Sequence, residues 1–133
     1  MGKVQILAVL TMDGCLSSEL YDKAHQDLCL DRCGLDEIRK KAFYRVTPDY
    51  SISMLHEWRK DCTNIRYLAE ATPDTADYIN GLLRMHAVDE IILYTVPFIS
   101  GSGRHFFKSA LPEQHWTLSS LKSYPNGVCR IIY

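Results

Sequence analysis

Histidine and cysteine recur in one stretch of the chain at a spacing that could hold a metal ion. His25, Cys29 and Cys33 are four residues apart, which would place them on one face of a helix. Gly34, a typical helix end, follows the third residue, and the sequence signals no fourth ligand. Because buried cysteine behaves as a small apolar side chain, we interpret the set as core and predict no metal site.

The sequence contains only weak signals for a catalytic nucleophile or a dinucleotide site. The remaining histidines are scattered along the chain: His56, His86, His105 and His115. No Ser/His/Asp or Cys/His nucleophile signature accompanies them, so we interpret them as structural. Gly101-Ser102-Gly103 alone is too short to count as a dinucleotide fingerprint.

Two polar segments follow predicted strands. Thr11-Met12-Asp13-Gly14 ends the apolar run 4–10, and Asp-Gly is a strong turn signal by itself. Glu70 either contacts a ligand ribose or is a solvated strand end; the residues alone leave both open. Thr72-Pro73-Asp74 has the pattern of a helix start, with Thr as N-cap, Pro in the first turn and Asp facing the helix dipole.

The elements that must position these segments fit an α/β fold. We expect strands at 4–10, 50–55, 64–69 and 88–96, and helices at 18–30, at 35–42, from 72 to about 86 and at 104–110. Asn126-Gly127 between 114–124 and 128–133 is a strong hairpin signal. This order predicts a mixed, mostly parallel sheet with helices on both faces and a C-terminal antiparallel hairpin.

Composition limits the class of protein. The 133 residues, 47% hydrophobic and 23% charged, predict a single domain over 1–133. A net charge of −1, with Arg39-Lys40-Lys41 as the nearest basic cluster on a solvated helix face, predicts no nucleic-acid partner. The longest apolar stretch, 6–10, is too short for a bilayer. Five cysteines without a signal-peptide pattern predict a cytoplasmic protein with reduced thiols.

Several motifs together resemble the dihydrofolate reductase-like superfamily, and most closely the C-terminal reductase domain of bifunctional riboflavin biosynthesis proteins. Ala8 to Gly14 is similar to the first strand and its Ser/Thr-x-Asp-Gly turn. Val88-Asp89-Glu90, then Pro97, then Gly101-Ser102-Gly103 with Phe106 resemble that family's strand, proline and Gly-x-Gly…Phe loop. The likeness covers residues 4–14 and roughly 65–133.

The resemblance implies a three-layer α/β/α fold and an NADPH-dependent reductase of the pyrimidine reductase type, acting on a small heterocyclic or ribosylamino substrate. It implies substrate contacts at Thr11, Asp13, Gly14 and Glu70, and cofactor contacts at Ala71, Thr72, Gly101 and Gly103. It also implies a homodimer. The cofactor supplies the hydride chemistry in such enzymes, while the protein orients the nicotinamide against the substrate.

One departure from the family motif supports an alternative. The family's Glu-Gly-Gly stands here as Glu70-Ala71-Thr72-Pro73-Asp74. Two Cβ atoms, a missing amide donor and a carboxylate all disfavour a pyrophosphate at the start of the helix. The alternative is therefore a catalytically silent member of the fold, with a degenerate cofactor site, acting as a binding or dimerisation module.

Overall fold

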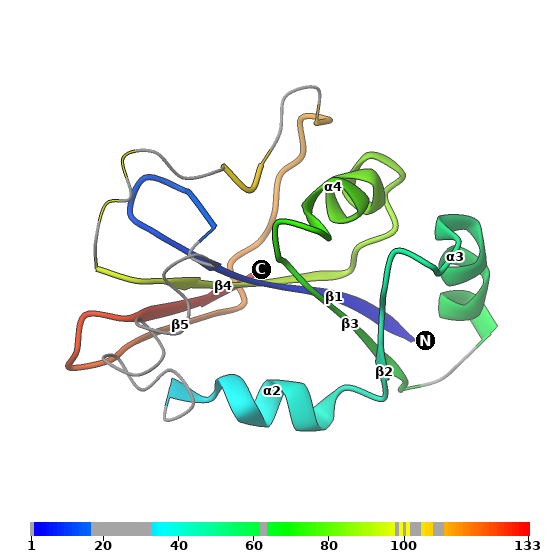
Figure 1. Ribbon diagram of the computed structural model, residues 1–133. Helices are drawn as coiled ribbons and strands as arrows, with labels where there is room; N and C mark the ends of the chain where they lie inside the picture. Colours follow the sequence, from blue (N-terminus) through cyan, green and yellow to red (C-terminus); the bar gives the residue numbers. More distant parts are fainter. Residues whose placement is uncertain are drawn as a thin grey trace.

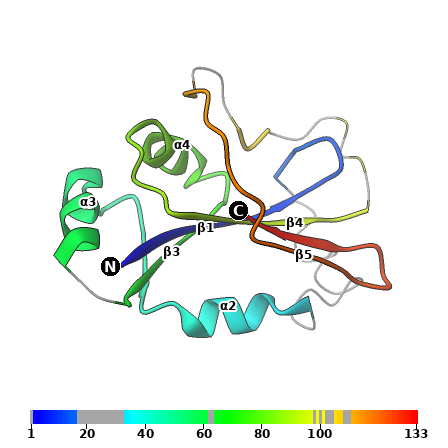
Figure 2. The same cartoon turned by 180° about the vertical axis from the view of Figure 1, so that it is seen from behind.

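A central sheet lies between two layers of helices. The computed structural model describes residues 2–16, 33–61, 64–97, 99, 101, 105–107 and 111–133. One face of the sheet carries α2 (Leu35–Lys41), and the other carries α3 (Ile52–Asp61) and α4 (Ala76–Arg84), as both views show (Figures 1 and 2). The predicted three-layer α/β/α class is confirmed.

The sheet has six strands in the order β2-β3-β1-β4-β6-β5. Their bounds are β1 Lys3–Leu10, β2 Tyr44–Arg45, β3 Arg66–Glu70, β4 Glu90–Thr95, β5 Ser120–Ser123 and β6 Cys129–Ile132. The first four are parallel to one another, and β6 runs antiparallel to both β4 and β5. The predicted mixed, mostly parallel sheet and its closing hairpin are therefore present.

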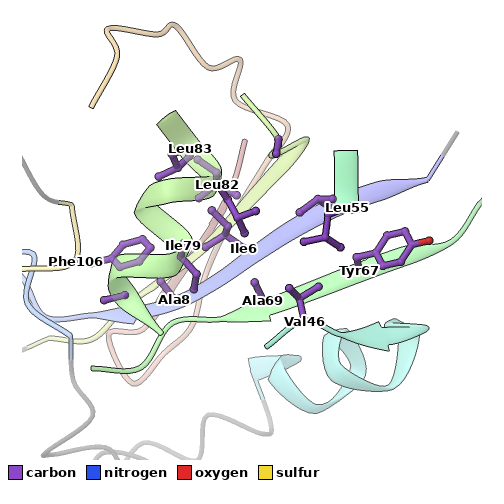
Figure 3. Close-up of a cluster of buried hydrophobic side chains, with 14 of the residues drawn as sticks. Ile6, Ala8, Val46, Leu55, Tyr67, Ala69, Ile79, Leu82, Leu83 and Phe106 are labelled. Atoms are coloured by element: carbon purple, nitrogen blue, oxygen red, sulfur yellow. The ribbon is translucent and has the colours of Figure 1, made fainter. Parts of the chain in front are cut away.

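Strand β1 lies at the centre because its residues are apolar on both faces. Its even-numbered residues, such as Ile6 and Ala8, pack under α4 together with Ile79 and Leu82 (Figure 3). Its odd-numbered residues, Leu7 and Val9, belong to the second core on the α2 side. Side chains alternate across a strand, so a continuous apolar run supplies two cores at once.

Residues 50–55 were predicted as a strand, and this is wrong. Ile52 begins α3, which continues through the charged stretch to Asp61. Within it Leu55 is fully buried, while Ser53, Met54 and Glu57 are exposed. The buried and exposed positions follow the 3.6-residue period of a helix rather than the alternation of a strand. In the sequence, a short apolar run is compatible with either element.

Other boundaries also differ from the prediction. The first hairpin strand begins at Ser120 instead of 114, and β2, only two residues long, was missed. His105 forms an isolated antiparallel bridge with Cys15, so 105–107 are not helical as predicted. The helix predicted at 18–30 lies outside the described residues. In the part of the chain that is described, no helix has both the length and the apolar character to cross a membrane.

Tyr94 provides a test of the second core. Its side chain is fully buried, its hydroxyl donates to the Cys33 carbonyl oxygen at 2.8 Å, and burial raises its pKa to about 12, with a nearby Arg130 acting in the opposite direction. The phenol of an unfolded chain titrates near 10. Between these pH values the unfolded state binds fewer protons than the folded state, so the free energy of unfolding falls as pH rises.

We predict that the stabilisation due to Tyr94 is complete below about pH 10 and is lost as pH rises toward about 12. Tyr94→Phe should have lower stability at pH 9 and a shallower loss above pH 10. Urea unfolding of both proteins from pH 9 to 12 measures this difference. Parallel loss in the two proteins would show that Tyr94 does not titrate in this way.

Candidate functional site

The carboxyl ends of β1, β3 and β4 are at the same edge of the sheet, where open α/β sheets bind ligands. The turn after β1 lies at this edge. Thr11 is 2% exposed, and its backbone N–H donates to the Cys15 carbonyl oxygen at 2.9 Å. Its hydroxyl oxygen accepts from the Cys15 N–H at 3.1 Å. Thr11 is thus a residue that holds the turn closed.

Asp13 joins this turn to the loop that follows β4. One of its carboxylate oxygens accepts a hydrogen bond from the Thr11 hydroxyl. The other accepts the backbone N–H of Gly101 at 3.0 Å. The structure therefore brings together three of the predicted site residues, Thr11, Asp13 and Gly101, from segments 88 residues apart. Gly103 lies outside the described residues.

Gly14 completes the turn at φ 79°, a conformation that favours glycine. The His105 ring lies across it, with Nδ1 3.7 Å from the position that a Cβ atom would take. The same nitrogen is 4.0 Å from the Cys15 Sγ, and the Phe106 N–H donates to the Gly14 carbonyl oxygen at 3.2 Å. His105 and Cys15 were not predicted as site residues: His105 was interpreted as one of several scattered structural histidines, and Cys15 as a reduced thiol.

Helix α4 anchors the segment that covers the turn. Asn80 is fully buried, and its side-chain amide donates at 2.8 Å both to the Ala76 carbonyl oxygen and to that of Phe106. Phe106 is itself fully buried beneath α4 (Figure 3). This amide therefore fixes residues 105–107 relative to α4, and through them the position of His105.

Glu70 lies apart from the turn. Its side chain points to the α2 side, where one oxygen accepts from Arg39 at 2.7 and 2.9 Å and the other from Arg45 at 2.9 Å. Glu70 pairs in register with Leu7, and Thr11 is four residues further along β1, about 13 Å at strand spacing. The structure thus places Glu70 in an ion-pair cluster, a role that its sequence context did not indicate.

The turn that precedes α4 is closed by two threonines. The Thr72 N–H donates to the Thr75 hydroxyl at 2.8 Å, and the Thr75 N–H donates to the Thr72 hydroxyl at 3.2 Å. The Thr75 hydroxyl in turn donates to the Glu70 carbonyl oxygen at 2.7 Å. Ala71 uses its N–H in a bond to the Leu7 carbonyl oxygen at 2.8 Å. The predicted helix start at Thr72 is wrong, because α4 begins at Ala76 and its N-cap, Thr75, makes no side-chain capping bond.

As arranged here, these residues do not fit the pyrophosphate of a dinucleotide. A pyrophosphate needs free backbone N–H groups and a positive electrostatic environment at a helix start. The N–H groups of Ala71, Thr72 and Thr75 are all engaged, Pro73 has none, and Asp74 adds a negative charge. The backbone N–H groups of the predicted cofactor contacts Ala71 and Thr72 are therefore already used in hydrogen bonds within the chain.

The described residues contain no group of three or more potential metal ligands. Cys33 is buried in the core on the α2 side, while His25 and Cys29, its proposed partners, lie outside the described residues.

Comparison with solved structures places the fold. A crystal structure described as a riboflavin biosynthesis protein from Shewanella sp. PV-4 superposes with a TM-score of 0.63 at 12% identity, covering 98% of this chain and 97% of that chain. A pyrimidine reductase-like protein from Corynebacterium diphtheriae is also similar, with a TM-score of 0.47 at 13% identity, covering 98% and 90%. No family model and no curated protein matches the sequence.

The likeness to the Shewanella protein extends over nearly the whole of both chains, which agrees with the resemblance carried by the sequence motifs. At this identity it speaks for the arrangement of helices and strands rather than for an activity. The chain therefore has the same α/β/α fold as the Shewanella protein.

Proposed function

We propose that this chain binds a small polar heterocycle at the Thr11–Gly14 turn, in the manner of riboflavin- and folate-type reductases. The observation that carries the proposal is the convergence of Thr11, Asp13 and the Gly101 N–H at the carboxyl edge of the sheet. A turn and a loop from distant parts of the chain are held together there by one carboxylate. Thr11 and Asp13 come from the Thr11–Gly14 motif, and Gly101 comes from the loop that follows β4.

Asp13 is the residue proposed to contact the ligand. Its carboxylate is partly exposed beside the Thr11 hydroxyl and the Gly101 N–H, and a charged acceptor at this place suits a ring N–H donor. Thr11 is buried and serves to position Asp13. The neighbouring His105 ring is exposed and forms the other side of the turn. This arrangement suits an amino-substituted pyrimidine or pterin-like ring, which presents N–H donors in its plane.

The activity class supported by the resemblance is an NADPH-dependent reduction, in which the cofactor, when bound, supplies a hydride to a C=N or C=O carbon. This chain's own contribution would be to hold the ring at Asp13. For the cofactor to bind at the start of α4, the hydroxyls of Thr72 and Thr75 must first release two backbone N–H groups.

A second candidate is a catalytically silent member of the fold that binds its ligand without turnover. The reciprocal hydrogen bonds of Thr72 and Thr75 favour this version, because they fill the place where backbone N–H groups would meet phosphate. Asp74 favours it too, since its charge opposes an anion at a helix start. The two versions share the heterocycle site and differ in cofactor binding.

The heterocycle site is tested with 2,4-diaminopyrimidine as the probe, by isothermal titration calorimetry. We predict saturable binding by the wild-type chain and a loss of about tenfold or more in affinity for Asp13→Ala, because a charged acceptor is removed. Asp36→Ala, an exposed carboxylate at the start of α2, is the matched control and should bind like wild type. Equal affinity in all three proteins would place the ligand elsewhere.

Cofactor binding is tested by NADPH titration, with the fluorescence of Trp58 and Trp116 and the melting temperature as readouts. We predict no saturation at millimolar NADPH for the wild-type chain, because the N–H groups of Ala71, Thr72 and Thr75 before α4 are already engaged. Asp74→Gly removes the opposing charge and is compared with Asp49→Gly, an exposed position before α3. Saturation of the wild type in the micromolar range, about −8 kcal/mol, would instead support the reductase version.

A further inference from the structure

A column of aromatic rings lines the edge of the sheet at β2. Tyr44 of β2 stacks on Tyr67 of β3, with ring centroids 5.6 Å apart and planes 14° apart. Trp58 of α3 also stacks with Tyr67, with ring centroids 6.4 Å apart and planes 26° apart. Phe43 lies tilted against Tyr44 at 5.6 Å. These four residues form the aromatic rim: Tyr44, Tyr67 and Trp58 belong to β2, β3 and α3, and Phe43 directly precedes β2.

The rim is open to solvent at its outer end. Phe43 is 69% exposed, Tyr44 47% and Trp58 36%, whereas Tyr67 is buried between its neighbours. Met54 on α3 adds a side chain that is 44% exposed. Large exposed aromatic surface is costly to leave in water and commonly marks a binding surface.

The charge of this part of the chain is opposite to that of the whole. α2, β2 and β3 together contain five Lys or Arg and three Asp or Glu, a net charge of +2, although the complete chain has −1. Averaging over 133 residues therefore conceals a basic region. The fold concentrates it, because the end of α2, β2 and the start of β3 are adjacent at one edge of the sheet (Figure 1).

Two of these cations have no carboxylate partner in the described part of the chain. Lys41 and Arg66 are both exposed and form no ion pair with any described residue. Arg45 is 59% exposed while it contacts Glu70, which it shares with Arg39. The edge therefore presents positive charge to solvent.

Rings and cations occupy opposite sides of the edge. Tyr67 belongs to the core beneath α3 and α4, and its partner Tyr44 faces the same way. Arg45 follows Tyr44 in β2, and Arg66 precedes Tyr67 in β3. Because successive side chains of a strand point to opposite faces of the sheet, those of Arg45 and Arg66 point to the α2 side. A chain lying along β2 would meet stacking surface on one side and positive charge on the other.

We propose that this edge binds single-stranded nucleic acid, with bases stacked on Phe43 and Tyr44 and phosphates near Lys41, Arg45 and Arg66. Aromatic rings beside a basic strip are the general means of binding such strands without reading their sequence. A peptide added as a new strand is disfavoured, since β2 offers only two residues of edge. A second copy of the chain is disfavoured by like charges meeting at a symmetric contact.

The proposal is independent of the heterocycle site and is tested with a fluorescein-labelled oligothymidylate of twelve nucleotides, by anisotropy at 50 and 200 mM salt. We expect saturable binding that weakens with salt. Phe43→Ala should weaken it at least about fivefold through the loss of a stacking surface. Lys41→Gln and Arg66→Gln should each reduce the slope of log affinity against log salt by about 0.7.

Leu118→Ala and Lys122→Gln, exposed positions on the hairpin side of the sheet, are the matched controls and should bind like wild type. Far-ultraviolet circular dichroism and melting temperature confirm that each variant is folded. No saturable binding at 50 mM salt overturns the proposal. So does equal affinity for a labelled glutamate-rich peptide of the same charge, which would assign the edge to acidic protein segments. Binding unaffected by the three rim and cation variants also overturns it.

Discussion

The structure depends on the pairing of β1 with a parallel strand on each side. β1 pairs with β3 from Lys3↔Arg66 to Leu7↔Glu70, and with β4 from Gln5↔Glu90 to Leu10↔Thr95. Polar atoms within this buried strand are satisfied by the same neighbours: the Gln5 amide donates to Glu90 at 2.9 Å, and the Val4 N–H donates to Asp89 at 2.9 Å. These bonds fix the register of the two parallel pairs.

That register determines where functional groups can meet. The last residue of β3, Glu70, pairs with Leu7, whereas β1 continues to Leu10. The start of α4, which follows β3, therefore lies closer to the amino end of β1 than the turn at Thr11 does. The turn instead meets the loop after β4, through Asp13 and Gly101. The turn before α4 takes no part in this contact and is closed by the hydroxyls of Thr72 and Thr75. One register thus accounts for the contact between the Thr11–Gly14 turn and Gly101 and for the separate position of the α4 start.

Local signals in the sequence predicted much of this fold, and long-range contacts account for what was missed. The apolar run of β1 and the Asn126-Gly127 hairpin each carry their signal within a few residues, whereas α4 begins at Ala76 and not at the predicted Thr72. Residues 50–55 were assigned to a strand because a short apolar run fits both the two-residue period of a strand and the 3.6-residue period of a helix. The site is harder still: Glu70 meets Arg39 and Arg45 across 31 and 25 residues, and Cys15 meets His105 across 90. No local pattern encodes such pairs.

The proposed ligand site is tested most directly by an amide NMR map of the Thr11–Gly14 turn, recorded while 2,4-diaminopyrimidine is added to the isotopically labelled chain. We expect the largest shifts at the amides of Asp13, Gly14 and Gly101, with the Thr72 and Thr75 amides unmoved. Shifts centred on Thr72 and Thr75, or spread evenly over the sheet, would contradict a ligand site at the carboxyl end of β1.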